Sequence, residues 1–267
     1  MIFHTLDALP GPYDHVYLSP HLDDAALSCG GSIAQQRAAG QSVLVVTLCT
    51  AAPPPAGPFS DLARSFHEAW GLSPAEAVAA RLREDEAAMA ALGADALWAG
   101  KLDAIYRHPA VYNRREALFG APDPDDPLLP ELRALIGALR ERMPQATIYA
   151  PLGVGHHVDH LLTCRAALAV AGEPLAFYED FPYVARDGEL ERRMAGLGLP
   201  LSARVIALDG AAAPKAAAIS AYTSQMAELA ESQLGRPAAG DEALRVMLAA
   251  VAARERAVGG ERFWARA

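Results

Sequence analysis

The strongest constraint on the fold is a series of short apolar segments that alternate with longer helix-like segments. The clearest of them, residues 42–48, is almost continuously apolar and rich in β-branched side chains. Such runs are typical of strands buried on both faces of a parallel sheet. The alternation therefore predicts an α/β fold, a Rossmann-like, mostly parallel sheet with helices on both faces. In open sheets of this kind the ligand site lies at the C-terminal edge of the strands.

The same patterns set the expected boundaries of the elements. Strands are predicted at 14–20, 42–48, 95–99, 146–150, 174–178 and 203–208. Helices are predicted at 24–39, 61–71, 74–92, 131–142, 159–171, 211–231 and 240–256. The stretch 102–130 is rich in Pro and Asp and has no clear period, so we expect a long loop there with one helical turn. The 267 residues are long enough for a substantial core, and we expect a single domain over 1–267.

Composition narrows the range of partners. The net charge is −9 and no Lys/Arg-rich run occurs, which argues against a nucleic acid or an anionic membrane as partner. The first residues do not have the pattern of a secretory signal, and no stretch is long enough to span a membrane, so we expect a cytoplasmic protein. Cys29, Cys49 and Cys164 are isolated in apolar surroundings, which is typical of buried free thiols.

Two clusters of potential metal ligands follow predicted strands. His21, Asp23 and Asp24 come after the strand at 14–20, and Gly155-His156-His157-Val158-Asp159-His160 comes after the strand at 146–150. Because the C-terminal ends of parallel strands meet at one edge of a sheet, the clusters can converge. Two adjacent carboxylates repel each other unless a cation or several donors compensate, which favours a metal site.

His21, Asp24 and one histidine of the second cluster would supply two nitrogens and one oxygen to a cation. That set leaves a position open for water, as in catalytic zinc sites, whereas structural zinc commonly takes four protein ligands. His157 and His160 have helical spacing and can face one cavity. The alternative is that the histidines cap the helix beginning near Val158 and that Asp159 only interacts with its dipole.

These motifs resemble those of the PIG-L/LmbE family of zinc-dependent deacetylases, which remove acetyl groups from N-acetylglucosamine-type sugars. The first family motif is similar to Pro20-His21-Leu22-Asp23-Asp24, and the second to His157-Val158-Asp159-His160. The likeness extends over nearly the whole chain through Arg81-x-x-Glu84, Leu92-Gly93, Asp103, Lys215 and Tyr222-Thr223-Ser224-Gln225.

The resemblance implies roles for individual residues. It implies His21, Asp24 and His160 as metal ligands and Asp23 as general base. It further implies that a protonated His157 stabilises the oxyanion of the reaction, with Asp159 orienting the His157 ring and keeping it charged. The cofactor implied is Zn2+, and Fe2+ is the alternative because the ligand set accepts either metal.

Substrate contacts follow less directly from the motifs. The resemblance suggests that Arg81 and Asp103 bind the sugar, although Arg81 also fits a solvated intrahelical pair. Some relatives carry a tyrosine where this chain has Gly155. Tyr183 is expected to border the pocket, and the 102–130 segment is either a substrate lid or a plain surface excursion.

The resulting hypothesis is a metal-dependent hydrolase that acts on a small N-acetylated amino sugar or its glycoconjugate. The alternatives are a non-haem iron enzyme, a catalytically silent sugar-binding protein on the same fold, and a receiver-like switch that binds magnesium through the two acids. The sequence leaves the sugar and its aglycone open, and it leaves a homo-oligomer open.

Overall fold

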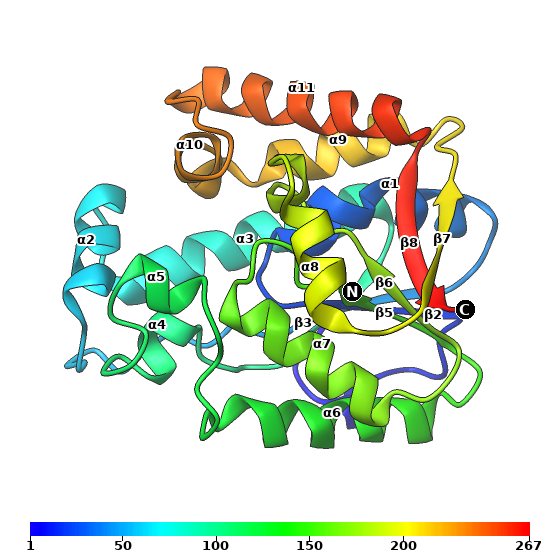
Figure 1. The fold of residues 1–267 in the computed structure, drawn as a ribbon, viewed down its shortest axis with the longest axis horizontal. Coiled ribbons are helices and arrows are strands. Elements are labelled where there is room, and N and C mark those ends of the chain that lie inside the picture. Colours follow the sequence, from blue (N-terminus) through cyan, green and yellow to red (C-terminus); the bar gives the residue numbers. More distant parts are fainter.

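An eight-stranded sheet forms the centre of the molecule (Figure 1). The computed structural model describes residues 1–68 and 71–267, and residues 69 and 70 only as part of a helix. The strands are β1 (Ile2–Phe3), β2 (His15–Ser19), β3 (Val43–Thr47), β4 (Asp95–Trp98), β5 (Thr147–Pro151), β6 (Leu175–Tyr178), β7 (Leu201–Ile206) and β8 (Glu261–Arg266). Their order is β1-β4-β3-β2-β5-β6-β8-β7. Neighbours from β1 to β6 are parallel, and β8 is antiparallel to both β6 and β7, which confirms the predicted mostly parallel sheet.

Helices cover both faces of this sheet. They are α1 (Asp24–Ala38), α2 (Asp61–Trp70), α3 (Pro74–Leu92), α4 (Ala104–Arg107), α5 (Arg115–Leu118), α6 (Leu128–Arg142), α7 (Val158–Val170), α8 (Glu189–Leu197), α9 (Ala212–Ala221), α10 (Thr223–Ser232) and α11 (Gly240–Val258), with short 3-10 turns at Leu6–Ala8 and Tyr183–Ala185. Figure 1 shows α6 and α7 on one side and α1, α3, α9 and α11 on the other. Every residue of β3 is buried between these layers, as its apolar run predicts.

The strand order places the two ligand clusters side by side. From β2 the chain moves outward to β3 and β4 on one side, and β5 then adds on the opposite side of β2. In the β2–β5 ladder, His15 pairs with Thr147 and Tyr17 with Tyr149. The reversal of direction between β2 and β5 makes their C-terminal ends a topological switch point, where open α/β sheets bind ligands. Residues 21–24 and 155–160 follow these two strands.

Helix α3 forms as its sequence predicts. The side chain of Ser73 accepts a hydrogen bond from the Glu76 N–H, and Glu76 reaches back to the Ser73 N–H, which makes a capping box. Pro74 occupies the first turn, and Gly93 ends the helix with φ of 67°, a left-handed conformation that favours glycine. Both helix ends therefore agree with the predicted boundaries.

Two predicted segments differ from the structure. The stretch 102–130 contains two short helices, α4 and α5, and helix α6 begins at Leu128 rather than 131. The predicted helix 211–231 is interrupted at Tyr222, whose φ and ψ are −87° and 76°. Tyr222 is held there because its hydroxyl donates to Asp85, and Glu84 accepts the N–H groups of Thr223 and Ser224 at the start of α10. Alanine-rich composition does not reveal such a side-chain-driven break.

The sequence patterns missed β1, β8 and α8. Strand β8 has the sequence Glu-Arg-Phe-Trp-Ala-Arg, which is too charged to resemble the buried parallel strands. It pairs with β6 on one side and with the largely exposed β7 on the other. An antiparallel strand near a sheet edge needs only one covered face, so its sequence signal is weak.

One hydrophobic cluster runs from Leu9 to Phe263 and includes side chains from the strands and from both helical layers. A smaller cluster around Tyr112 joins the region of α2, α4 and α5. The single-domain assignment stays a prediction. Among the residues described, no helix is both long and apolar enough to cross a bilayer.

The buried Asp85 generates a prediction about stability. Its carboxylate accepts hydrogen bonds from Trp98 Nε1 and Tyr222 Oη, both at 2.7 Å, and burial raises its pKa from 3.8 to about 7. At pH values between these two pKa values, Asp85 keeps its proton in the folded protein, whereas the unfolded chain has released it. The free energy of unfolding should fall as pH rises from about 4 to about 7, by up to about 4 kcal/mol from this group.

Urea denaturation at several pH values checks this expectation. Asp85→Asn should lose this part of the pH dependence, whereas Glu86→Gln, an exposed neighbour on the same helix, should keep it. Equal pH profiles for the wild type and Asp85→Asn would show that Asp85 is ionised in the folded protein throughout this range.

Candidate metal centre and active site

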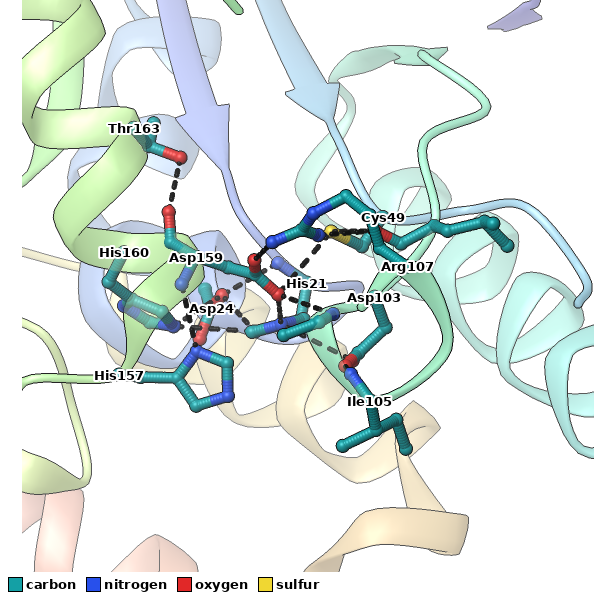
Figure 2. Close-up of polar contacts among 12 residues, drawn as sticks. His21, Asp24, Cys49, Asp103, Ile105, Arg107, His157, Asp159, His160 and Thr163 are labelled. Atoms are coloured by element: carbon teal, nitrogen blue, oxygen red, sulfur yellow. Dashed lines mark hydrogen bonds and ion pairs between the residues drawn. The ribbon is translucent and has the colours of Figure 1, made fainter. Parts of the chain in front are cut away.

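The two ligand clusters meet at the C-terminal edge of β2 and β5. Figure 2 shows the side chains of His21, Asp24, His157 and His160 converging there from the start of α1 and the start of α7. All four residues are buried. The ring nitrogens of His21, His157 and His160 include a set within 4.8 Å of one another, which is compatible with a shared metal ion.

Three atoms form a nearly equilateral triangle. His21 Nδ1, Asp24 Oδ2 and His160 Nε2 are separated pairwise by 3.3 Å. Ligand atoms bound to one zinc ion at about 2.0–2.1 Å in tetrahedral geometry lie about 3.3–3.4 Å apart. The three donors predicted as metal ligands therefore fit one face of a zinc tetrahedron, and the two-nitrogen, one-oxygen set suits Zn2+ or Fe2+.

Buried carboxylates make this region favourable for positive charge. Burial alone lowers the pKa of His160, but the Asp24 and Asp180 carboxylates outweigh it and raise that pKa to about 9. Burial alone raises the pKa of Asp24, but His160 and His21 outweigh it and hold the pKa well below its usual range. A divalent cation can take the place of protons on these rings.

Asp180 orients His160 and was not identified from the sequence. Its Oδ1 lies 2.7 Å from His160 Nδ1, and its Oδ2 accepts the N–H groups of Gly153 and Val154 at 2.8 Å each. This arrangement leaves His160 Nε2 to face Asp24 and His21. Metal-binding histidines usually make such a contact through their second nitrogen. The only sequence signal was its position directly after strand 174–178.

Asp159 orients His21 rather than His157. Its Oδ2 lies 3.2 Å from His21 Nε2, and its Oδ1 accepts from Arg107 at 2.6 Å. Arg107 also forms a two-pronged ion pair with Asp126, at 2.8 and 2.9 Å. Arg107 and Asp126 lie within the predicted 102–130 segment, and sequence reasoning did not assign them to the site. The sequence predicted that the Asp159 carboxylate orients His157. In the structure, the Asp159 backbone N–H contacts His157 Nδ1 instead.

His157 both caps a helix and faces the pocket. As the N-cap of α7, its Nδ1 accepts the Asp159 N–H at 3.2 Å, so the capping alternative is correct in part. Its ring meets that of His21 edge-on, with centroids 4.7 Å apart. Burial, followed by the neighbouring His21, lowers the pKa of His157 well below its usual value. This shift favours the neutral ring, whereas the resemblance implies a charged one.

Asp23 occupies the pocket wall beside the triangle. It is buried at the start of α1, and its Oδ1 lies 3.8 Å from the Arg81 guanidinium. Burial raises the pKa of Asp23, and Arg81 opposes that shift. Arg81 thus forms an ion pair with Asp23, outside its own helix.

Asp103 also lines the pocket. Its Oδ2 lies 3.5 Å from His21 Nε2, and its Oδ1 accepts the Ile105 N–H. Arg81 lines the same pocket, so the structure brings both predicted substrate-binding residues to the site.

The pocket itself has a void of about 760 Å3 including its mouth. Ile105, Leu118 and Phe119 from the 102–130 segment line it, which makes that segment part of the pocket wall; its action as a lid stays a prediction. Tyr183 borders the pocket as expected. Its ring leaves no room for a side chain at position 155, where a Cβ would lie 2.4 Å from Tyr183 Cγ.

Other residues singled out in the sequence lie outside the pocket. Lys215 is buried, and its Nζ donates to Glu255 and Glu261 at 2.7 Å each. His156 lies near Arg192 and Glu189 on the other side of its loop. Cys29, Cys49 and Cys164 are free thiols, and Cys49 Sγ lies 3.8 Å from Asp159 Oδ2.

The sequence matches a known protein family over the region that contains both ligand clusters. The sequence profile of PIG-L, described as GlcNAc-PI de-N-acetylase, matches residues 16–171, which contain both ligand clusters. The chain belongs to the PIG-L family. A 2'-N-acetylparomamine deacetylase from Niallia circulans is 31% identical over 191 residues, covering 65% of this chain and 69% of that protein.

Solved structures of related deacetylases cover nearly the whole chain. Teicoplanin deacetylase Orf2, solved in a zinc-inhibited form, is 30% identical with a TM-score of 0.74, and the match covers 93% of this chain and 96% of that one. The A40926 pseudoaglycone deacetylase Dbv21 is 28% identical with a TM-score of 0.70, covering 95% and 96%. The PIG-L fold therefore extends beyond the profile match into the C-terminal helices.

The Asp180–His160 contact generates a second prediction. Asp180→Asn should weaken zinc binding by about 10- to 100-fold, because the carboxylate orients His160 and strengthens it as a ligand. Zinc titration against a competing chelator measures this, with circular dichroism to verify folding. Asp187→Asn, an exposed aspartate near α8, is the matched control and should bind zinc like the wild type. Unchanged affinity in Asp180→Asn would exclude the orienting role.

Proposed function

We propose that this protein is a metal-dependent hydrolase that removes the acetyl group from the nitrogen of an N-acetylglucosamine-type sugar or glycoconjugate. The observation that carries the proposal is the 3.3 Å triangle of His21, Asp24 and His160 in a pocket that also contains Asp23. Support comes from family membership and from relatives that are deacetylases. The free thiols fit a reducing compartment, in keeping with a cytoplasmic enzyme.

His21, Asp24 and His160 would hold the metal, with Zn2+ as the first choice and Fe2+ as the alternative. When bound, such a metal polarises the amide carbonyl and lowers the pKa of water toward about 7. Asp180 and Asp159 keep the two imidazoles in the orientation that directs His160 Nε2 and His21 Nδ1 toward Asp24. The chain thus supplies a preorganised anionic site for one divalent cation.

Asp23 is the proposed general base. Its carboxylate accepts a proton from the attacking water as the water oxygen bonds to the acetyl carbon. Burial raises the pKa of Asp23, which makes it a stronger base, while the Arg81 guanidinium opposes that rise and favours the carboxylate form. The C–N bond then breaks as the sugar nitrogen takes up the proton that Asp23 accepted, so the amine leaves with acetic acid, which ionises to acetate, and Asp23 is again a carboxylate.

His157 is the proposed donor to the developing oxyanion. Because its Nδ1 already accepts the Asp159 N–H, the Nε2–H of the neutral ring is available to the substrate. A neutral donor placed beside a cation site stabilises negative charge without repelling the metal. Arg81 and Asp103 line the same pocket and are proposed to bind sugar hydroxyls.

Asp23→Asn tests the proposed chemistry. The variant should keep its zinc but lose about 100- to 10,000-fold in kcat, because removal of a general base has an effect of that size. Release of free amine from N-acetylglucosamine conjugates measures the rate, and elemental analysis measures the metal. Asp7→Asn, an exposed aspartate far from the pocket in sequence, is the control. Full activity in Asp23→Asn would refute its role.

Metal removal tests the ligand set. Chelation should abolish amine release, and about one equivalent of Zn2+ per chain should restore it. His160→Ala should bind zinc too weakly to be reactivated at that ratio, because it loses one of three ligands. His156→Ala, whose ring lies outside the pocket lining, should behave like the wild type. Stoichiometric zinc in His160→Ala would show that the assigned ligand set is wrong.

A further inference from the structure

The two nitrogens of His21 face different groups of donor atoms. Nδ1 belongs to the 3.3 Å triangle, whereas Nε2 lies 3.2 Å from Asp159 Oδ2 and 3.5 Å from Asp103 Oδ2. Figure 2 shows Cys49 and Asp103 on the side of the ring away from the triangle. The two sides of one imidazole therefore meet two separate sets of potential metal ligands.

The thiol of Cys49 belongs to the second set. Cys49 follows β3, the neighbour of β2 in the sheet, and is partly exposed. Its Sγ lies 3.8 Å from Asp159 Oδ2 and 3.7 Å from the carbonyl oxygen of Leu102. One donor atom each of His21, Cys49 and Asp159 lies within 4.8 Å of the other two. The ends of three neighbouring strands thus bring a nitrogen, a sulfur and an oxygen together.

The spacing of these atoms suits a tetrahedral ion. With metal–sulfur and metal–oxygen bonds of about 2.3 and 2.1 Å, sulfur and oxygen ligands lie about 3.6 Å apart, and nitrogen and oxygen ligands about 3.3 Å apart. The observed separations are 3.8 Å for Cys49 and Asp159 and 3.2 Å for His21 and Asp159. Asp103 Oδ2, at 3.5 Å from His21 Nε2, supplies the fourth donor.

Asp159 Oδ2 is the oxygen on which this set converges. It contacts His21 Nε2, Cys49 Sγ and the Ala104 N–H, the last at 3.1 Å. A metal ion can replace the ring proton and the thiol proton among these donors. Arg107 donates to the other oxygen, Oδ1, at 2.6 Å, so that contact is kept when a cation binds at Oδ2.

The pocket gives an ion access to this set. His21 and Asp103 both line the pocket, and the Asp103 side chain is 22% exposed. The Nε2 side of the His21 ring is therefore reached past Asp103. A thiolate donor favours soft, sulfur-binding metals, which the triangle of two nitrogens and one oxygen does not select.

We propose that His21 Nε2, Cys49 Sγ, Asp159 Oδ2 and Asp103 Oδ2 form a second metal site, which takes a sulfur-binding divalent ion and shares His21 with the triangle. When both sites are occupied, the His21 ring has lost its Nε2 proton and bridges the two ions, and Cys49 is a thiolate. The second ion also holds Asp103 away from the substrate, so its binding inhibits hydrolysis. Only this inhibition rests on the proposed function.

A cadmium titration tests the site in the full chain loaded with one equivalent of Zn2+. Added Cd2+ should produce a thiolate-to-metal charge-transfer band in the ultraviolet that saturates near one equivalent per chain. Cadmium that only displaces zinc from the triangle gives no such band, because the triangle contains no sulfur. Absence of the band in the wild type would overturn the proposal.

Cysteine variants assign the band to one thiol. Cys49→Ser should abolish it, and persistence of the band in this variant would overturn the proposal. Cys164→Ser is the matched control and should keep the band. Cys164 Sγ lies 3.3 Å from the Arg193 guanidinium, and within the described part of the chain Cys164 joins no group of potential metal ligands.

Asp103→Asn keeps the test valid if Cys49→Ser fails to fold. It should weaken binding of the second ion by more than about tenfold, since loss of a direct ligand costs at least as much affinity as loss of an outer partner. Asp125→Asn, an exposed aspartate of the same segment, should bind Cd2+ like the wild type. Unchanged affinity in Asp103→Asn would overturn the four-donor site.

Amine release measures the inhibition. Cadmium should inhibit the zinc-loaded wild type, and Cys49→Ser should need at least about tenfold more cadmium for the same loss. Equal inhibition of the two proteins would overturn the inhibitory role. Absence of hydrolysis by the zinc-loaded protein, together with a Cys49-dependent band, would instead overturn the proposed function and leave the second metal site standing.

Discussion

The candidate site at the C-terminal edge of the sheet depends on three buried polar atoms that the fold holds 3.3 Å apart. Two imidazoles and a carboxylate at that separation are compatible only with shared protons or a shared cation. The position of β2 beside β5 creates this proximity, because the clusters that follow the two strands are more than a hundred residues apart in sequence. The sheet topology is thus the cause of the site, and the motifs supply its chemistry.

The surrounding carboxylates explain why the site needs so many supporting contacts. Asp24, Asp159 and Asp180 are all nearly inaccessible, and each has defined donors: the two ligand histidines, Arg107, or backbone N–H groups. Buried charges of one sign are stable only when they are paired in this way. Arg107 is therefore a structural requirement of the site, although it lies outside the two motifs and comes from a segment with no regular pattern.

The sequence predicted the core of the fold, and the convergence of the two ligand clusters, because both depend on local patterns. The β-branched run of β3 and the Ser73–Glu76 cap of α3 carry their structure in neighbouring residues. The charged β8, the break at Tyr222 and the role of Asp180 depend on partners distant in sequence, which no local pattern reveals. The contact at His157 Nδ1 likewise comes from a backbone N–H that only the folded start of α7 supplies.

The ion pair between Arg107 and Asp126 connects the pocket wall with the metal-ligand cluster. This ion pair joins the two residues that flank the stretch 108–125. Arg107 also donates to the Asp159 carboxylate, which in turn contacts His21. The stretch between Arg107 and Asp126 contributes Leu118 and Phe119 to the pocket wall, whereas Arg107 itself contacts the Asp159 carboxylate beside His21. Tyr112, within the stretch 108–125, donates its hydroxyl to the same Asp126 carboxylate, so the packing of the pocket wall and the position of Arg107 are coupled.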